Sequence, residues 1–504
     1  MKTRPTYHLA ALIAALMLQS QTAGVFAQGS LTPAGAPAPT MKTLDQIEPR
    51  TAITNTSSLV TISQPGSYYL THNLTVASGD GIDIITNGVK LDLNGFTISS
   101  TSATASGTAI LLNGGSAALK NITILNGSIQ SGFTNNGSGT YSGGGFDRGI
   151  EYISSAYPST VSVSGCNVSG CYSFGIDLGL GGSVVEACKV KTVGSSGIVA
   201  SVVRQCVVKD CGGSFNAAIY AEVVSDSEAE YTGYGSSAAI SAKTVQHCLG
   251  LASSFNIANS SYGISGTTVI NSEGDSYGGG TGISAAIANN SYGSSSYGTG
   301  LVITDSANNC SGHSPYGIGI SMGNYGCLNN CAAKLNGTGI VMGDFASIFN
   351  CVIIGNSSNG VVAGQNCVVR GCTASGSGSV GTNGVGIIAG IRSTIEGCTV
   401  NDNRNDGINA AGDSVILNNH ASHNGLGLSS AAGIHIAGAG SRIEGNQTRD
   451  NSGYGIKSDG GAGADIIIRN ASGGNGIANY SPTNGNYFAP VQTPINATNA
   501  WGNL

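Results

Sequence analysis

The sequence predicts an all-β fold, a single-stranded right-handed parallel β-helix. This solenoid would have about 17 coils, a short helical cap at its N-terminus and an irregular cap at its C-terminus. Three observations support the prediction. A Gly-Ile dipeptide recurs at a regular spacing, each repeat contains short alternating apolar pairs, and an asparagine returns at a fixed place in the repeat.

The Gly-Ile dipeptide sets the length of the repeat. Successive copies lie between 18 residues apart, from Gly282 to Gly300, and 26 residues apart, from Gly149 to Gly175. A period of this size is typical of a solenoid, in which each repeat packs only on its neighbours. The isoleucines of these copies should form one continuous interior stack: Ile150, Ile176, Ile198, Ile283, Ile340, Ile387, Ile408, Ile434 and Ile456.

The pattern inside one repeat, residues 393–410, indicates strands rather than helices. Apolar residues come in pairs two apart, as at Cys398 and Val400 and again at Ile408 and Ala410. This is the period of a β-strand, and the breaks in phase between pairs indicate corners. Each coil should therefore contain three short strands, and successive coils should stack about 4.8 Å apart.

An asparagine, or a small substitute for it, recurs five residues after the small residue of the repeat. Asparagine tolerates the left-handed backbone that a sharp corner needs. In stacked parallel coils, each amide can also bond to its neighbour and so build a ladder. The ladder should contain Asn336, Asn356, Asn403, Asn424, Asn451 and Asn475.

The N-terminal segment has the pattern of a secretory signal peptide, residues 1–27. Lys2 and Arg4 provide the positive start, and the apolar stretch from Leu9 to Leu18 is too short to span a bilayer. We therefore expect a protein exported to the cell surface or the medium. Residues 28–50 should be a linker and N-terminal cap, including a short helix over Thr40 to Ile47 that covers the open first coil.

The repeat pattern predicts a β-helix over residues 51–476. After about residue 476 the period is lost, so residues 477–504 should fold as an irregular cap with Trp501 as its anchor.

Two sequence segments near the N-terminus resemble a known group of proteins. VTISQPGSYYL and GIDIITNGVKLDLNGFTIS, together with the Gly-Ile and Asn pattern and the closing NAWGN, resemble bacterial right-handed β-helix repeat proteins of the pectin-lyase-like superfamily. The resemblance implies the fold. It leaves the activity open, because the superfamily contains lyases, hydrolases, epimerases and adhesins.

The composition excludes some partners. Only 9% of the residues are charged, against roughly 25% in an average soluble protein. The net charge is −6 and no basic block occurs, so nucleic acid is not expected as a partner. Beyond the N-terminal stretch, no segment is long and apolar enough to predict a membrane span.

Most of the 13 cysteines share the small position of the repeat. Stacked in register, their Cβ atoms would lie about 4.8 Å apart, wider than the roughly 3.8 Å of a disulfide. We therefore expect buried, reduced thiols, with the Cys327/Cys331 and Cys367/Cys372 neighbourhoods as the exceptions where a disulfide stays open. The column contains Cys166, Cys188, Cys206, Cys248, Cys331, Cys351, Cys372 and Cys398.

The residue after each Gly-Ile should point outward, and near the C-terminus this column carries a candidate catalytic set. Asn409, His435 and Lys457 fall on successive coils, with Asp406 and Asp459 near them as binding residues. Proton abstraction beside a uronate carboxylate needs a base and a cation. In this hypothesis His435 accepts the proton, Lys457 neutralises the uronate, and Asn409 orients the chain. The alternative is a solvated polar face.

Two further sets are candidate sites. Glu151 and Asp177 stand on adjacent coils with Asp147 close by, and these carboxylates could act as an acid/base pair, could bind calcium, or could be solvated groups on a polar face. The tyrosines of the Tyr-Gly repeats, Tyr262, Tyr277 and Tyr292 among them, could form a platform for sugar rings, or could stack on each other for structural reasons.

Together these patterns predict a secreted or cell-surface β-helix protein that binds or processes an extracellular polysaccharide, with an acidic polymer among the candidates. An enzyme of this kind would resemble a polysaccharide lyase or a glycoside hydrolase. The sequence lacks the Asp-Asp and His-Gly text of pectin hydrolases and the Asp-Pro-His-Glu of alginate epimerases. The alternative is a non-catalytic structural surface protein or adhesin.

Overall fold

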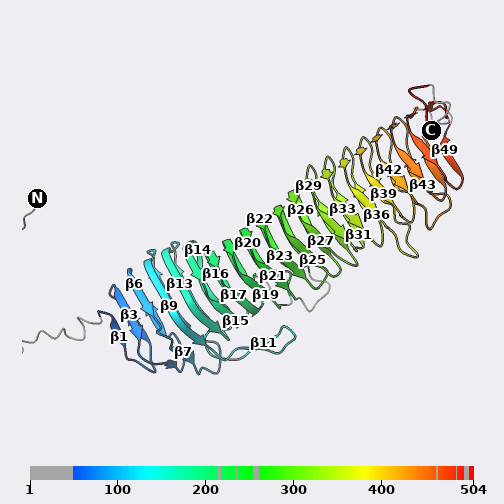
Figure 1. Cartoon of the computed structure of the whole chain (residues 1–504). Coiled ribbons are helices and arrows are strands. Elements are labelled where there is room, and N and C mark those ends of the chain that lie inside the picture. Colours follow the sequence, from blue (N-terminus) through cyan, green and yellow to red (C-terminus); the bar gives the residue numbers. More distant parts are fainter. Residues whose placement is uncertain are drawn as a thin grey trace, which may run out of the picture. The chain divides into compact units, whose positions relative to one another are not determined.

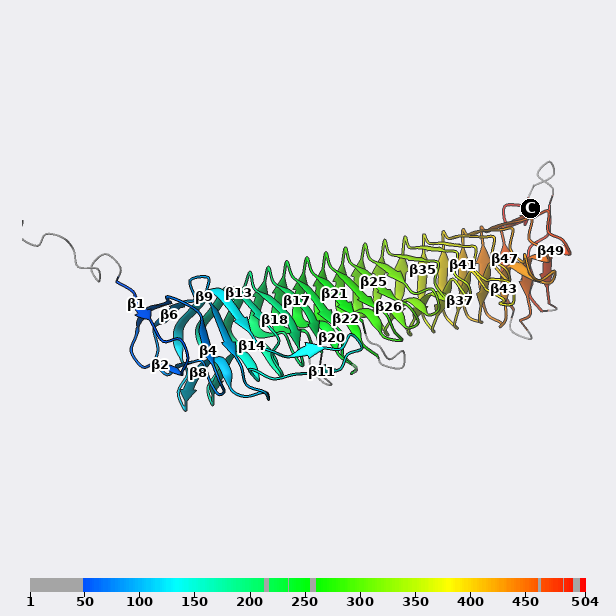
Figure 2. The same ribbon diagram turned by 90° about the horizontal axis from the view of Figure 1, so that it is seen from below.

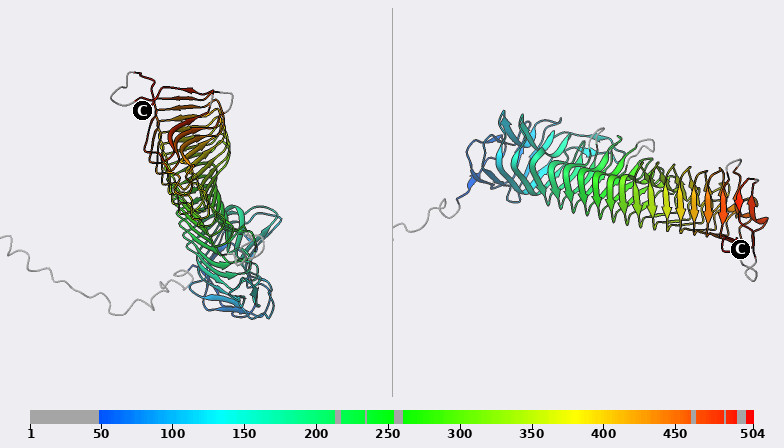
Figure 3. Two further views of the ribbon diagram at one scale, coloured as in Figure 1. Left: turned by 90° about the vertical axis from the view of Figure 1, so that its right-hand side faces the viewer. Right: turned by 90° about the horizontal axis from the view of Figure 1, so that it is seen from above.

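The computed structural model describes residues 49–212, 217–233, 235–253, 260–460, 464–483, 485–492 and 499–504. Residues 51–504 form one compact unit, an elongated parallel β-solenoid of about 20 coils (Figures 1 and 2). Its strands lie side by side along the length of the unit (Figure 3). No helix occurs in the described residues, so none there could cross a membrane.

Each coil carries up to three strands, which we call A, B and C in chain order. The A strands contain the Gly-Ile dipeptides, and from β14 to β26 each of them runs on into the B position. They are β2 (Val60–Ile62), β5 (Ile82–Ile84), β8 (Thr108–Gly115), β12 (Arg148–Ser154), β14 (Phe174–Glu186), β16 (Ile198–Arg204), β18 (Ile219–Ser225), β20 (Ala238–Gln246), β22 (Tyr262–Ile270), β24 (Thr281–Asn289), β26 (Thr299–Asn308), β28 (Ile318–Met322), β31 (Thr338–Met342), β34 (Val361–Ala363), β37 (Ile387–Ala389), β40 (Ile408–Ala410), β43 (Ala432–Ile436), β46 (Tyr454–Ser458) and β49 (Ala478–Pro482).

The B strands stack on a second face, where β9 and β13 run on into the C position. They are β1 (Thr51–Ile53), β3 (Gly66–Leu70), β6 (Val89–Asp92), β9 (Lys120–Gln130), β13 (Ser159–Ser169), β29 (Cys327–Asn329), β32 (Ser347–Phe349), β35 (Val368–Arg370), β38 (Thr394–Glu396), β41 (Val415–Leu417), β44 (Arg442–Glu444), β47 (Ile466–Ile468) and β50 (Tyr487–Phe488).

The C strands form the third face. They are β4 (Leu74–Val76), β7 (Thr97–Ser100), β15 (Lys189–Val193), β17 (Val207–Cys211), β19 (Glu228–Tyr231), β21 (Leu249–Ala252), β23 (Glu273–Ser276), β25 (Tyr292–Ser295), β27 (Ser311–His313), β30 (Ala332–Lys334), β33 (Val352–Ile354), β36 (Thr373–Ser375), β39 (Thr399–Asn401), β42 (His420–Ser422), β45 (Gln447–Arg449) and β48 (Ala471–Gly473).

The predicted interior stack is confirmed. Each isoleucine of the Gly-Ile series pairs with its counterpart on the next A strand, as in Ile387 with Ile408 and Ile408 with Ile434. All nine predicted isoleucines are fully buried. Burial of this column along the unit contributes to its hydrophobic stabilisation.

The predicted asparagine ladder is also confirmed. The Asn403 backbone N–H and side-chain amide both donate to Oδ1 of Asn424, and Asn424 donates in the same way to Asn451. The series ends at Asn475, which accepts from Asn451. Each amide therefore satisfies buried backbone groups at the corner between strand C and the next strand A.

A second ladder, which the sequence analysis missed, continues the cysteine column. The Cys398 N–H donates to Asn419, and the series runs on through Asn446 and Asn470 to Asn503. The cysteines are all free, and all are buried except the half-buried Cys327.

Several predictions about the ends need correction. The structure has about 20 coils rather than 17. The predicted number of coils was too low because the first and last coils lack the Gly-Ile dipeptide. In the last coil, Tyr480 takes the position of the isoleucine, opposite Ile456. Trp501, the predicted anchor of the cap, is half exposed and lies against the Arg469 guanidinium, whose carbon is 3.9 Å from the ring centroid, so it is not a buried residue of the cap. Asn503 of the cap is fully buried instead. The predicted signal peptide and the predicted helix over 40–47 lie outside the described residues.

One excursion leaves the solenoid between β9 and β12. It contains the hairpin of β10 (Thr134–Asn135) and β11 (Tyr141–Ser142), and in Figure 2 β11 appears below β18 and β20. Asn135 and Tyr141 both donate to the carboxylate of Asp210, at 2.6 and 3.2 Å. These bonds hold the hairpin against the coil that contains Asp210, 69 residues after Tyr141 in the chain.

Candidate functional sites

The structure brings the predicted C-terminal set together on face A. Asn409 lies on β40, His435 on β43 and Lys457 on β46, and the strand register places each directly opposite the next. Asp406 precedes β40 and Asp459 follows β46. We call these five residues the face-A network.

Hydrogen bonds join all five members of this network. Asp406 is buried and accepts from the Ala432 backbone N–H at 2.7 Å, while its Oδ2 lies 2.9 Å from Nδ2 of Asn409 and 3.0 Å from Nδ1 of His435. On the other side of the ring, Nε2 of His435 lies 2.8 Å from Oδ2 of Asp459. Lys457 Nζ donates to that same oxygen at 2.8 Å.

These contacts favour the protonated form of His435. A carboxylate faces each ring nitrogen, and an ionised carboxylate only accepts, so a ring with a proton on both nitrogens matches these two neighbours. The hydrogen bond to Asp406 accordingly raises the pKa of His435, although burial acts in the opposite direction. The ring would have to lose a proton before it could accept one from a substrate, so its pKa is not the unperturbed one that the hypothesis assumed.

Lys457 is likewise engaged. Partial burial would raise the pKa of Asp459, but hydrogen bonds from Lys457 and His435 outweigh burial and lower it. His435 and Lys457 both face carboxylates within the network, so Lys457 is not free to neutralise a uronate carboxylate. In this arrangement the network is a closed set of ion pairs.

The predicted calcium site is also occupied by protein groups. Glu151 pairs with Asp177 in register, but Arg148 bonds directly to the Glu151 carboxylate and also lies 3.3 Å from Asp147. Burial raises the pKa of both Glu151 and Asp177. Within the described part of the chain, no group of three or more His, Cys, Asp or Glu side chains is arranged to hold a metal ion.

The three predicted tyrosines lie in different places. Tyr262 is on β22 of face A and lines a pocket of its own with Tyr220. Tyr292 is on β25 of face C, and Tyr277 is exposed just after β23. The structure therefore does not bring them into one platform. A stacked pair exists elsewhere, between the exposed rings of Tyr297 and Tyr316, with centroids 5.2 Å apart.

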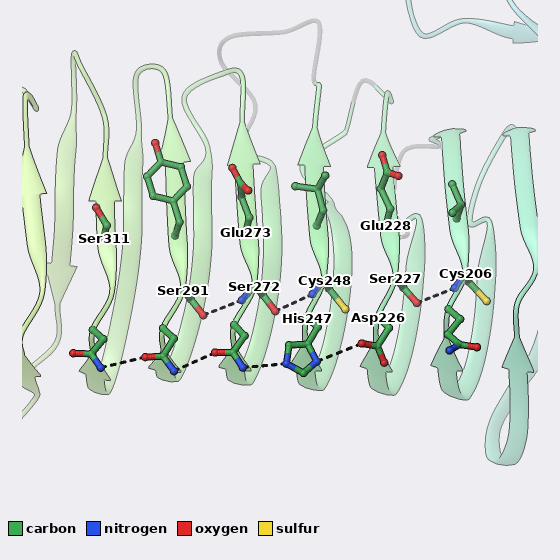
Figure 4. A pocket seen from close by; sticks show the side chains of 17 residues that line it. Cys206, Asp226, Ser227, Glu228, His247, Cys248, Ser272, Glu273, Ser291 and Ser311 are labelled. Carbon is green, nitrogen blue, oxygen red and sulfur yellow. Dashed lines mark hydrogen bonds and ion pairs between the residues drawn. The ribbon is translucent and has the colours of Figure 1, made fainter.

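A shallow groove of about 1160 Å³ lies over the corner between strands B and C. It crosses six successive coils, from Gln205 to Ser311, and we call it the corner groove (Figure 4). One wall is a column of left-handed corner residues. His247 lies 3.3 Å from Asp226 on one side and 3.1 Å from Asn271 on the other. The amides of Asn271, Asn290 and Asn309 continue the chain of bonds: Asn290 donates to Asn271 and Asn309 to Asn290.

The opposite wall of the groove comes from the C strands. Glu228, Glu273 and Tyr292 occupy equivalent positions on β19, β23 and β25, with Leu249 on β21 between the two glutamates. The two labelled glutamates point away from the amide column in Figure 4. Glu228 pairs with Lys209 at 2.9 Å, whereas Glu273 has no ion-pair partner among the described residues. Glu273 raises the pKa of its neighbour Asp275, after burial as the larger cause.

The corner groove was not predicted from the sequence, although the sequence contains a signal for one of its walls. The residue before each small position is left-handed and comes from the types that tolerate this conformation, among them Asp226 with φ 49° and His247 with φ 52°. The sequence therefore predicts a column of such residues at one fixed position of the repeat. It does not predict the groove itself, because the groove depends on how far the side chains of the C strands project from the surface.

Comparisons with known proteins bear on the fold. The family described as a right-handed beta helix region matches residues 316–472. The comparison with curated protein sequences gives no match. Among solved structures, the A-module of a mannuronan C-5 epimerase from Azotobacter vinelandii is 13% identical, with 83% of this chain and 90% of that chain covered and a TM-score of 0.21.

Two further solved structures are similar at the same level. The Dettilon tailspike protein is 14% identical, with 80% and 62% coverage and a TM-score of 0.24. The catalytic domain of a GH87 α-1,3-glucanase is 12% identical, with 82% and 70% coverage and a TM-score of 0.23. At these identities and TM-scores the likeness carries no argument about a ligand. By sequence and by fold, residues 316–472 are a right-handed β-helix region.

Proposed function

We propose that this protein binds an extracellular polysaccharide, and that the corner groove holds the chain. The observation that carries the proposal is the shape of the groove: it is shallow, open and elongated, and it crosses six coils. Polar groups repeat along it at the coil spacing of about 4.8 Å, which is similar to the length of one sugar ring. A linear polymer of hydroxyl-rich units matches such a surface better than a compact ligand does.

The charges of the groove favour an uncharged polymer. Asp226, Glu228 and Glu273 contribute three carboxylates, against Lys209 beside the groove and His247 within it. An acidic chain would be repelled by Glu273 in particular. Amide and hydroxyl groups of the column, with the ring of Tyr292, can instead bond to sugar hydroxyls and pack on the apolar side of a ring.

Location and any catalytic step belong to this proposal as well. Export rests on the signal peptide expected over residues 1–27, and it would give the protein access to an extracellular glycan. The groove supports binding. Glycan processing at the face-A network would use His435 as a proton donor, because carboxylates face both ring nitrogens and favour the protonated ring.

The test is binding of the purified protein to panels of neutral and acidic polysaccharides, with new reducing ends and unsaturated products measured in parallel. We expect at least one neutral polymer to bind, and Tyr292→Ala to weaken it about tenfold, a change of 1.4 kcal/mol. Tyr297→Ala is the matched control, because Tyr297 is an exposed tyrosine outside the groove. Binding of acidic polymers alone, or equal binding by both variants, would contradict the proposal. Absence of any binding would favour the structural-rod alternative.

A further inference from the structure

A second, smaller pocket of about 390 Å³ lies on face A, over the strands β18, β20 and β22. Its floor carries the hydroxyls of Ser241 and Ser265, which sit opposite each other in the strand register. Tyr220 continues the same row on β18, where its side chain is 44% exposed. The other lining residues are Ala217, Ser237, Ala238 and Tyr262.

The two tyrosines stand at diagonally opposite corners of this pocket. Tyr262 aligns with Ala238, whereas Tyr220 aligns with Ser241, three residues further along the strand. The two rings are also separated by two coils. With about 3.3 Å per residue and about 4.8 Å per coil, their Cα atoms lie roughly 14 Å apart. That distance leaves room for one six-membered sugar ring between the two aromatic side chains.

None of the described residues that line the pocket is charged. The nearest charges along the same strands are Glu222 and Lys243, and they neutralise each other in an ion pair of 2.8 Å. The site therefore combines aromatic walls with a floor of hydroxyl groups, and it offers no counter-ion. An uncharged ligand with one apolar face and several hydroxyls satisfies all of these features.

We infer that this pocket is a second carbohydrate site, which takes a single uncharged pyranose unit. The inference does not depend on the corner groove, because the groove lies over the B–C corner and the pocket lies on face A. A short ligand that makes few contacts should bind weakly, in the millimolar range. A glycan end or branch is the natural form of such a unit.

The probe is saturation-transfer-difference NMR on the full chain, with glucose, galactose, mannose and N-acetylglucosamine tested separately. At least one of these sugars should receive saturation from the protein. Tyr220→Ala and Tyr262→Ala should each weaken its binding about tenfold, which corresponds to 1.4 kcal/mol. Tyr220→Phe should retain most of the affinity, because it keeps the ring that packs on the sugar.

Tyr292→Ala separates this inference from the proposed function. It removes the aromatic ring of the corner groove, so monosaccharide binding at the pocket should not change. The inference is overturned if none of the four sugars binds, or if both alanine variants on face A bind as tightly as the parent. It is also overturned if Tyr292→Ala alone abolishes monosaccharide binding, because the sugar would then occupy the groove.

Discussion

Replacing Asn424 by alanine should be among the most damaging single changes in the chain. Asn424 is fully buried at the corner between strand C and the next strand A. Its Oδ1 accepts from the N–H of Asn403 at 3.2 Å and from the Asn403 side chain at 2.9 Å. Its Nδ2 donates to the Val400 carbonyl at 2.9 Å and to Oδ1 of Asn451 at 3.0 Å.

The cost follows from the groups that lose their partners. The Asn403 N–H and the Val400 carbonyl would each lose a buried hydrogen bond, at about 1–3 kcal/mol per group. The Asn403 side chain keeps its bond to the Ala374 carbonyl, so it adds little. We therefore expect Asn424→Ala to lower the free energy of unfolding by about 2–6 kcal/mol.

The measurement is urea unfolding followed by far-UV circular dichroism and by the fluorescence of Trp501. Trp501 is the one tryptophan of the sequence and lies against Arg469, so it reports on the C-terminal coils. Thr399→Ala is the matched control, because this half-buried strand residue should change stability by no more than about 0.5 kcal/mol. If Asn424→Ala unfolds at the same urea concentration as the control, the ladder is not stabilising and the reasoning fails.

Three further predictions follow from other contacts. The hydrogen bond to Asp406 raises the pKa of His435 in the folded protein. The ion pairs of His435 with Asp406 and Asp459 therefore stabilise the fold fully below the unfolded-state pKa of about 6.5, and this stabilisation is lost as the pH rises through the folded-state pKa. The stability gap between the parent and His435→Gln should therefore shrink from pH 6 to pH 9 in urea unfolding, and a widening gap would refute this. Titration with a thiol reagent should find no more than one reactive cysteine, Cys327, in the native protein and all 13 after denaturation, and several native reactive thiols would contradict the burial. Asp210→Asn should speed amide hydrogen exchange in residues 131–145 without changing exchange at the interior isoleucines, whereas global destabilisation would give the hairpin a different role.

The interior of this fold was predictable because a solenoid repeats its constraints. A side chain that packs inside one coil faces the same surroundings at the same position of the next coil. The spacing of Ile387, Ile408 and Ile434 in the sequence was therefore enough to predict that they stack. The same logic predicted the Asn403 and Asn424 ladder. The same reasoning did not predict the second ladder. Its position in the repeat is a cysteine at Cys398 and an asparagine from Asn419 on, so no single residue type marks the column.

The exterior was predictable only in part. Register alone placed Asn409, His435 and Lys457 on neighbouring strands, and the structure brings them together. Their protonation was not predictable, because it depends on Asp406 and Asp459 closing on both sides of the ring. Arg148 similarly bonds to Glu151 and lies 3.3 Å from Asp147, whereas the sequence could only place these residues near one another.

We choose between the two candidate surfaces by asking whether their charged groups already pair with one another. In the face-A network every charge is matched, and partly exposed ion pairs of this kind contribute modestly to stability. A ligand would have to displace Lys457 or His435 from Asp459 before it could bind. Along the corner groove the amide column bonds mainly along its own length, and the carboxylate of Glu273 has no ion-pair partner among the described residues. Glu273 and the asparagines of the column can therefore meet a ligand without breaking an ion pair of their own, which is why we propose the corner groove, and not the face-A network, as the site for a long polar ligand.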